Sequence, residues 1–196
     1  MNSSYGKCAA VAALVIAEGG AAAVAEEGAQ RELKAHEHGR GSLNLVLEGK
    51  TLGLELEAPG MDIVGFEHAA ESTDSKAKVD KAKAKLSAAG ELFRLPAAAR
   101  CRLKESAVEL ESGKDHDEHE DEKGEDASES GGGHSAFHAT YTFICDDPDQ
   151  LTTIETTYFS AFTGAATLTA SIVTSKAQRQ AELSKEMPVI DLSASE

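Results

Sequence analysis

The sequence predicts an α+β domain with a mostly antiparallel sheet, two main helices and a long disordered acidic loop that also carries histidines. Three observations lead to this prediction. Leucines alternate with other residues over 42–58, apolar residues recur at helical spacing over 73–89, and residues 112–133 contain no large apolar side chain. Strands and helices that follow one another in blocks, without regular β-α alternation, are typical of the α+β class.

The first 25 residues are expected to be an export signal and are left out of the fold. Lys7 supplies a positive charge, residues 8–17 form an apolar run, and Ala23-Val24-Ala25 is a cleavage site of the A-x-A type, so that the signal is cut near Ala25. A disordered alanine-rich tail is the alternative. The mature chain, 26–196, is then one domain with a disordered insertion at about 112–133, and it has no apolar run long enough to cross a membrane.

The first predicted elements are a hairpin and a helix. Residues 42–58 alternate around a turn at 48–51, which places one set of side chains on a single apolar face: Leu43, Leu45, Leu47, Leu52, Leu54 and Leu56. Residues 73–89 place Val79, Ala82 and Leu86 on one side and a run of lysines elsewhere, as in an amphipathic helix whose lysine face is solvated.

Two cysteine-bearing strands are expected next, at 102–111 and 135–144. Cys8 leaves with the signal, and export places Cys101 and Cys145 in a compartment that permits disulfides. If the strands pair as an antiparallel hairpin with the cysteines opposite each other, three further pairs follow: Leu103 with Phe143, Ala107 with Ala139, and Leu110 with Ala136. We therefore predict a disulfide at the base of the acidic insertion. Two buried free thiols are the alternative.

The C-terminal quarter is expected to begin with a second helix. Asp147 is a suitable N-cap before Pro148, and one stripe of apolar residues follows at helical spacing: Leu151, Ile154, Tyr158 and Phe162. Residues 168–173 and 182–192 are further strand candidates, and Pro188 weakens the second of them.

The net charge and the absence of known motifs exclude several classes of function. The chain has 34 acids and 19 bases, a net charge of -15, which repels phosphate backbones and excludes nucleic-acid binding, while favouring a cation or a basic protein as partner. No G-x-S-x-G, P-loop or H-E-x-x-H motif is present, so an enzyme is not expected. Glu120 stands where a calcium loop of the EF-hand type needs glycine, which disfavours a tight calcium site.

Six of the seven histidines fall into three close pairs: His36 with His38, His116 with His119, and His134 with His138. Paired imidazoles with carboxylates nearby are the ligands that Zn²⁺ prefers. Plainer readings exist: an exposed chain end for the first pair, a solvated spacer for the second, and a turn or core position for the seventh histidine, His68. The third pair has the parity of a polar strand face, where we expect it to be exposed to solvent.

Two zinc sites of different strength are expected. His116 and His119 lie on the insertion, where residues 111–129 contain ten acids; these flexible ligands must be ordered on binding, so this site should collect zinc weakly. A tighter framework site should form where two strands begin, from His36 and His38 together with His134 and His138, with Glu67 or His68 added, because strand residues are preorganised. The two strands are assumed to be neighbours.

Five segments of the chain together resemble one known family: His36-Glu37-His38-Gly39, Gly65-Phe66-Glu67-His68, Ala99-Arg100-Cys101, the acidic histidine-containing insertion, and residues 134–145. The mature chain is similar throughout to the ZrgA-like family of periplasmic zinc-binding proteins. The resemblance implies zinc binding in the periplasm, association with an ABC-type zinc uptake system, and an insertion that collects metal. High capacity is not expected of this insertion, since it keeps only two histidines.

The sequence therefore predicts a non-enzymatic periplasmic protein that captures or buffers Zn²⁺, with delivery to an uptake system as a further expectation. One alternative is a periplasmic interaction protein whose acidic loop docks a basic partner and whose histidines are incidental. A hydrolase with a histidine-bound zinc is a more distant alternative.

Overall fold

The computed structural model describes residues 37–112 and 134–193. Its strands are β1 (Arg40–Glu48), β2 (Thr51–Pro59), β3 (Phe93–Arg94), β4 (Cys101–Ser112), β5 (Ser135–Cys145), β6 (Thr153–Thr156), β7 (Thr167–Thr174), β8 (Gln178–Ser184) and β9 (Val189–Asp191). Its helices are α1 (Gly60–Val64), α2 (Thr73–Ser87), α3 (Ala89–Leu92) and α4 (Tyr158–Ala161), with 3-10 turns η1 (Ala97–Ala99) and η2 (Pro148–Gln150).

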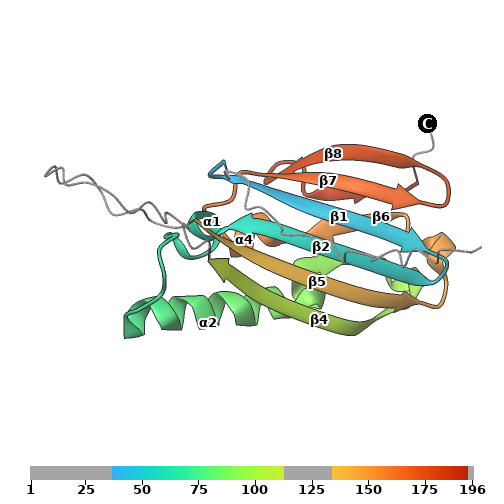
Figure 1. The fold of residues 1–196 in the computed structure, drawn as a ribbon. Helices are drawn as coiled ribbons and strands as arrows, with labels where there is room; N and C mark the ends of the chain where they lie inside the picture. Colours follow the sequence, from blue (N-terminus) through green and yellow to red (C-terminus); the bar gives the residue numbers. More distant parts are fainter. Residues whose placement is uncertain (1–36, 113–133, 194–196) are drawn as a thin grey trace, which may run out of the picture. The chain divides into compact units, whose positions relative to one another are not determined.

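Six strands form one mixed sheet in the order β4-β5-β2-β1-β7-β8, and three short strands form a second sheet, β3-β6-β9 (Figure 1). In the large sheet β1 and β7 run parallel, while the other neighbours are antiparallel. The predicted fold class is therefore wrong: these residues are mostly β, with a mixed sheet and four short helices, of which α2 is the longest. The parallel pair of β1 and β7 joins distant parts of the chain, and no local sequence pattern predicts this pairing.

The second predicted helix is also wrong. After Asp147 the chain makes the η2 turn, the strand β6 and the short helix α4. Threonines crowd this stretch, and β-branched residues favour extended backbone. The Thr157 N–H and the Thr156 hydroxyl also donate hydrogen bonds to the Leu92 carbonyl, which fixes the segment beside α3. The four stripe residues are nevertheless buried, because each faces the core.

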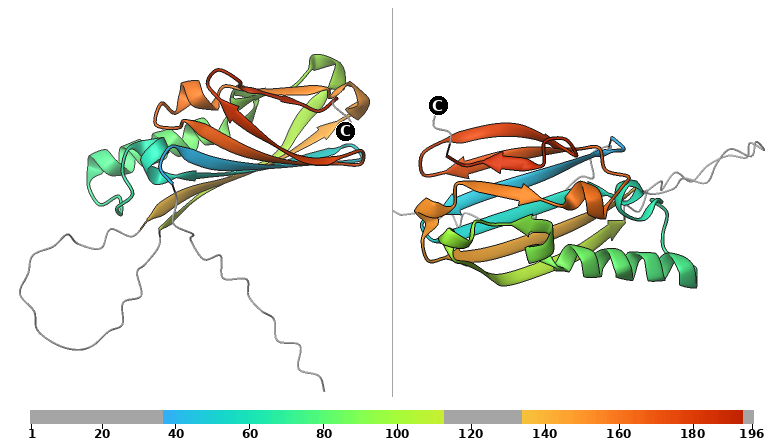
Figure 2. Two further views of the ribbon diagram at one scale, coloured as in Figure 1. Left: turned by 90° about the horizontal axis from the view of Figure 1, so that it is seen from above. Right: turned by 180° about the vertical axis from the view of Figure 1, so that it is seen from behind.

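The core lies on one face of the large sheet. The predicted leucine hairpin is confirmed as β1 and β2, and its leucines meet Tyr141 and Phe143 of β5 across the sheet. Seen from behind, α2, α4 and the small sheet lie over this face (Figure 2). The helix predicted over 73–89 is confirmed as α2, and the Tyr141 hydroxyl donates a hydrogen bond of 2.8 Å to the Leu86 carbonyl at its end.

The other face of the large sheet, the outer face, is turned toward the reader in Figure 1, and no described element covers it. Residues that alternate with the core positions make it polar and acidic; they include Glu55, Glu57, Glu105, Glu109, Glu182 and His138. The described residues contain no helix that is long and apolar enough to span a membrane.

The predicted disulfide between Cys101 and Cys145 is present, but it joins β4 and β5 at the end of their ladder opposite Ser112 and Ser135, so its predicted place at the base of the insertion is wrong. The predicted register holds beside the disulfide, since Leu103 faces Phe143. Beyond a bulge at Lys104 it is wrong by one residue: Ala107 faces Thr140, and Leu110 faces Phe137. A bulge adds one unpaired residue to one strand, which a count from the cysteines misses. The export signal and nearly all of the insertion lie outside the described residues.

Candidate metal centre

Three segments of the chain meet at one end of the large sheet. The strand β2 lies between β1 and β5 and is antiparallel to both, so β1 and β5 begin at the end of the sheet where β2 finishes. His38 precedes β1, His134 immediately precedes β5, and Glu67 follows α1 in the connection that leaves β2. The assumption that these two strands are neighbours is wrong, because β2 lies between them; their starts nevertheless lie at the same end of the sheet.

The Glu67 carboxylate contacts both imidazoles. Its Oε2 lies 2.8 Å from His134 Nδ1, and its Oε1 lies 3.2 Å from His38 Nε2. The carboxylate is 13% exposed, whereas the imidazoles are 56% and 54% exposed for His38 and His134. A shielded carboxylate therefore holds two accessible imidazoles, and we call these three side chains the His38–Glu67–His134 cluster.

The electrostatics of the cluster follow from its contacts. Burial alone would raise the pKa of the Glu67 carboxyl, but the hydrogen bonds and charges of His134 and His38 outweigh burial, and the pKa lies below its ordinary value of 4.5. Glu67 is therefore a carboxylate at neutral pH and supplies a negative charge where the two strands begin.

A buried carboxylate holds the backbone beside His38. The Gly39 N–H donates a hydrogen bond of 2.8 Å to Asp62 Oδ1, and the Asp62 side chain, on α1, is buried. Gly39 has a φ of 83°, a conformation that favours glycine, and it turns the chain from His38 into β1. Two acids in the connection after β2 therefore contact the start of β1: Asp62 accepts a hydrogen bond from its backbone, and Glu67 contacts the His38 imidazole.

Sequence reasoning missed Asp62. Its signal was present: it is the one acid in the run Gly60-Met61-Asp62-Ile63-Val64, directly after a strand. An acid in an apolar run is buried only when it is paired or hydrogen-bonded, so such a residue marks a structural contact worth seeking.

The other predicted ligands lie elsewhere or outside the described residues. His68 turns away from the cluster: its Nδ1 lies 2.9 Å from the Ala69 carbonyl and its ring stacks on Phe66 at 4.7 Å. His36, His116 and His119 lie outside the described residues. Whether any of the predicted histidines binds zinc stays a prediction.

His138 occupies the outer face, as its parity predicts, but it is buried rather than exposed, at 8%. Its Nε2 lies 3.2 Å from Glu111 Oε2 of β4, and the register places Glu57 of β2 and Glu109 of β4 directly beside it. Neighbouring side chains on both sides cover the ring, which parity alone cannot reveal. His138 is therefore separate from the cluster at the strand starts.

The donor set can be tested against a metal ion. Within residues 37–112 and 134–193, no three His, Cys, Asp or Glu side chains are arranged to hold a metal as they stand. The cluster is instead two imidazoles bound to one carboxylate, each through one ring nitrogen, so that His38 Nδ1 and His134 Nε2 face away from Glu67. Imidazoles that bind metal are commonly held in this way by a carboxylate at the opposite nitrogen. Two imidazoles held in this way supply donors of the type that zinc takes, and a zinc site here would need at least one further ligand.

Comparison with known protein families covers the described residues up to Leu192. Residues 35–192 match the model of a family described as ZrgA family zinc uptake protein. The match includes all three members of the cluster, both cysteines and the acidic insertion. No curated protein matches the chain at a significant level.

Proposed function

Since the chain belongs to the ZrgA family of zinc uptake proteins, we propose that it captures Zn²⁺ in the periplasm and passes it to an uptake system, without catalysing a reaction. Family membership supports a role in zinc uptake. The compartment, the capture site and the delivery step are our proposal, and they rest on the signal-like N-terminus and on the His38–Glu67–His134 cluster.

One observation carries the proposed site: a single shielded carboxylate contacts imidazoles from two strand starts. Zn²⁺ takes nitrogen and oxygen ligands in a small shell, and a ligand set from two ordered strands loses less freedom on binding than one from a loop. We assign His38 and His134 as ligands. Glu67 orients both rings and supplies the negative charge that favours a cation.

A third ligand is required to complete the shell, and the sequence offers His36, two residues before His38. His116 and His119 would serve as a weaker collecting pair, since their ordering on binding opposes affinity.

The experiment is a zinc titration in competition with a chromophoric chelator, on the full mature chain and on a variant lacking residues 113–133. We expect the deletion to reduce the number of bound ions but to keep one tight site. Adding His38→Ala and His134→Ala to the deletion should weaken that site at least about 100-fold. His68→Ala is the matched control, an exposed histidine in the same connection, and should change the affinity less than about 3-fold.

Two outcomes would contradict the proposal. Tight zinc binding that persists in the double variant would remove the framework site. Binding that disappears entirely with residues 113–133 would place capture on the insertion instead. Circular dichroism of each metal-free variant separates lost binding from lost folding.

A further inference from the structure

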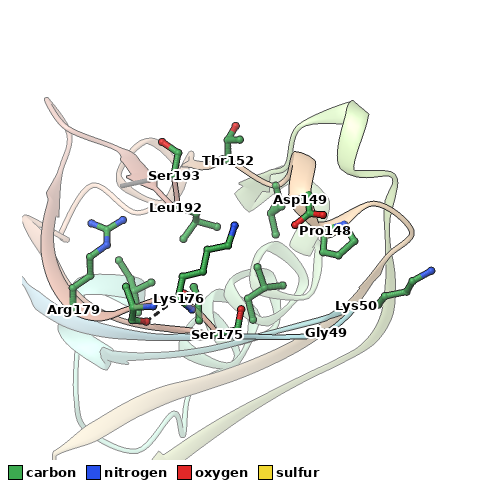
Figure 3. A pocket seen from close by; sticks show the side chains of 15 residues that line it. Gly49, Lys50, Pro148, Asp149, Thr152, Ser175, Lys176, Arg179, Leu192 and Ser193 are labelled. Atoms are coloured by element: carbon green, nitrogen blue, oxygen red, sulfur yellow. Dashed lines mark hydrogen bonds between the residues drawn. The ribbon is translucent and has the colours of Figure 1, made fainter. Parts of the chain in front are cut away.

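A pocket of about 520 Å³ lies at the end of the large sheet opposite the His38–Glu67–His134 cluster (Figure 3). Leu47 at the end of β1 and Ile172 near the end of β7 line it, together with residues of the β7–β8 turn, of η2 and of the segment after β9. His38 precedes β1 and Leu47 nearly ends it, so the pocket and the cluster are separated by most of a nine-residue strand, about 30 Å. They share no residue.

Three cations and one acid line the pocket: Lys50, Lys176, Arg179 and Asp149. Figure 3 shows Lys176 reaching over the centre of the pocket and Arg179 rising at one side, while Lys50 points away from it. Within residues 37–112 and 134–193, no ion pair joins Lys176 or Arg179 to a carboxylate. The other four arginines of the described residues, Arg40, Arg94, Arg100 and Arg102, are each joined to a carboxylate, so Arg179 is the exception among them.

Arg179 is the more informative of the two cations. It lies opposite Ile172, so its side chain extends from the edge strand β8 on the core side of the sheet. Its Nη2 atom is buried and has no hydrogen-bond partner among the described residues. A buried charged donor without an acceptor is costly, and an anion entering the pocket would relieve that cost.

Lys176 is presented by an ordered turn. The N–H groups of Lys176 and Ala177 each donate a hydrogen bond of 3.1 Å to Thr174 Oγ1, and the Thr174 N–H donates one of 2.9 Å to the Ala177 carbonyl. The backbone that carries the ammonium is thereby fixed beside Arg179, so less freedom is lost when both cations take one ligand.

We propose that this pocket binds a small organic carboxylate. The Arg179 guanidinium and the Lys176 ammonium take the carboxylate, because a guanidinium suits its planar pair of oxygens. The hydrocarbon part of the ligand lies against the apolar side chains that line the pocket: Leu47, Leu151, Ile172 and Leu192. The volume lies in the range of pockets that hold small molecules, and apolar walls with a few placed polar groups are typical of them.

A purely structural role for Arg179 predicts a different experimental result. A charge that points inward from an edge strand discourages pairing with another sheet, and it would need no ligand. In that case Arg179→Gln would alter self-association and leave carboxylate binding unaffected, so one experiment separates the two roles.

The test follows amide chemical shifts of the full mature chain while hexanoate is added. We expect saturable shifts at Thr174, Ala177 and Ser193, which surround the pocket. The double variant Lys176→Gln and Arg179→Gln should bind hexanoate at least about 10-fold more weakly, whereas Lys104→Gln, which removes a lysine from the exposed part of β4, should bind within about 2-fold of wild type. Hexanamide, which has the same shape without the charge, should bind at least about 10-fold more weakly than hexanoate.

Four results would overturn the proposal: no saturable shifts up to about 20 mM hexanoate, equal binding of hexanoate and hexanamide, unchanged binding in a folded double variant, or shifts confined to other parts of the chain. Inorganic phosphate tests the apolar half of the site, since it has the charge without the hydrocarbon. Phosphate binding as tight as that of hexanoate would overturn the assignment to organic carboxylates.

Discussion

His134 and His138 lie four residues apart along the start of β5, and each imidazole contacts one glutamate, yet their surroundings differ. His134 precedes the strand, is 54% exposed and meets Glu67 at 2.8 Å. His138 lies inside the sheet, is 8% exposed and meets Glu111 at 3.2 Å. The first contact joins a strand start to the connection after β2, and the second joins two neighbouring strands.

The comparison indicates that a histidine at a sheet can bind a metal only where its second ring nitrogen is accessible. No cross-strand neighbour of His134 lies among the described residues, and its exposed ring leaves the second nitrogen able to accept a metal. His138 is flanked by Glu57 and Glu109 and is almost fully covered, which leaves its ring little access to an ion from solvent. We therefore expect His134 to determine zinc affinity and His138 to determine stability. The following changes test whether the two histidines have these separate roles.

The largest expected effect comes from the disulfide, which fastens the far ends of β4 and β5. Closing a loop with a sequence separation of 44 residues contributes about 4 kcal/mol to the free energy of unfolding, through the unfolded state. Cys101→Ser with Cys145→Ser should lower stability by about 2 to 4 kcal/mol in urea unfolding. Zinc affinity should change less than about 3-fold, because β4 contributes nothing to the His38–Glu67–His134 cluster. A large loss of affinity in the folded variant would contradict the division.

Removing the shared carboxylate should have the next largest effect. Glu67→Ala takes the partner from both exposed imidazoles, and loss of a carboxylate that orients metal-binding histidines costs about 10- to 100-fold in affinity. Glu111→Ala is the matched change, since it removes the partner of His138, and it should leave zinc affinity within about 3-fold. Calorimetric titration of both variants measures the contrast, and equal losses would refute it.

Replacing the buried histidine should mainly affect folding. His138→Ala leaves Glu111 without its ion-pair partner and opens space between β2 and β4, at a cost of about 1 to 2 kcal/mol. His134→Ala changes an exposed side chain and should alter metal-free stability by less than about 0.5 kcal/mol. Urea unfolding without metal tests both changes, and a larger loss for His134→Ala would reverse the assignment.

A smaller change in zinc binding is expected from the buried acid on α1. Asp62→Asn keeps the size of the side chain and an oxygen that can accept from the Gly39 N–H, but it removes the charge, so we expect a loss of about 3- to 10-fold in zinc affinity through a looser His38. Asp74→Asn, which changes an exposed acid at the start of α2, is the control. If the two variants bind zinc equally well, Asp62 does not position His38.

The smallest expected effect is a pH dependence of the metal-free protein. The pKa of the Glu67 carboxyl is lowered by folding, so the stability that it contributes is present above the unfolded value of about 4.5 and is lost as the pH falls through the folded value. Glu67→Gln should therefore flatten the acid side of the stability profile below about pH 5. Carboxyl ¹³C shifts measure the pKa directly, and a value above 4.5 would contradict the cluster.

The parts that could be predicted from sequence are local. The alternation of Leu43 to Leu56 predicts the first hairpin, the spacing of Val79, Ala82 and Leu86 predicts α2, and the two cysteines predict their own pairing. The helix predicted from the apolar residues at 151–162 is wrong because the same four buried positions are also compatible with a turn, a short strand and a single helical turn. Helical spacing indicates which residues are buried but not the backbone conformation, and the threonines of this segment favour an extended one.

The candidate site could be predicted only in part. Histidine pairs beside strand starts predict that His38 and His134 come together, and Glu67 was a candidate alongside His68. The separation of His138 from His134 could not be predicted, since burial on the outer face depends on Glu111 and on a bulge at Lys104 that shifts the register. The pocket around Arg179 combines residues from distant turns, and no sequence pattern joins them.

The parallel pairing of β1 with β7 has a consequence for the order of folding. Until β7 is made, β1 has only β2 beside it, and the ladder groups on its other side have no strand to pair with. Contacts between distant parts of a chain slow folding, and an open strand edge invites pairing with other chains in the meantime. The growing protein is therefore most prone to aggregate just before its last fifth emerges, and a chaperone that shields β1 during that interval would raise the yield of folded protein without touching the finished molecule.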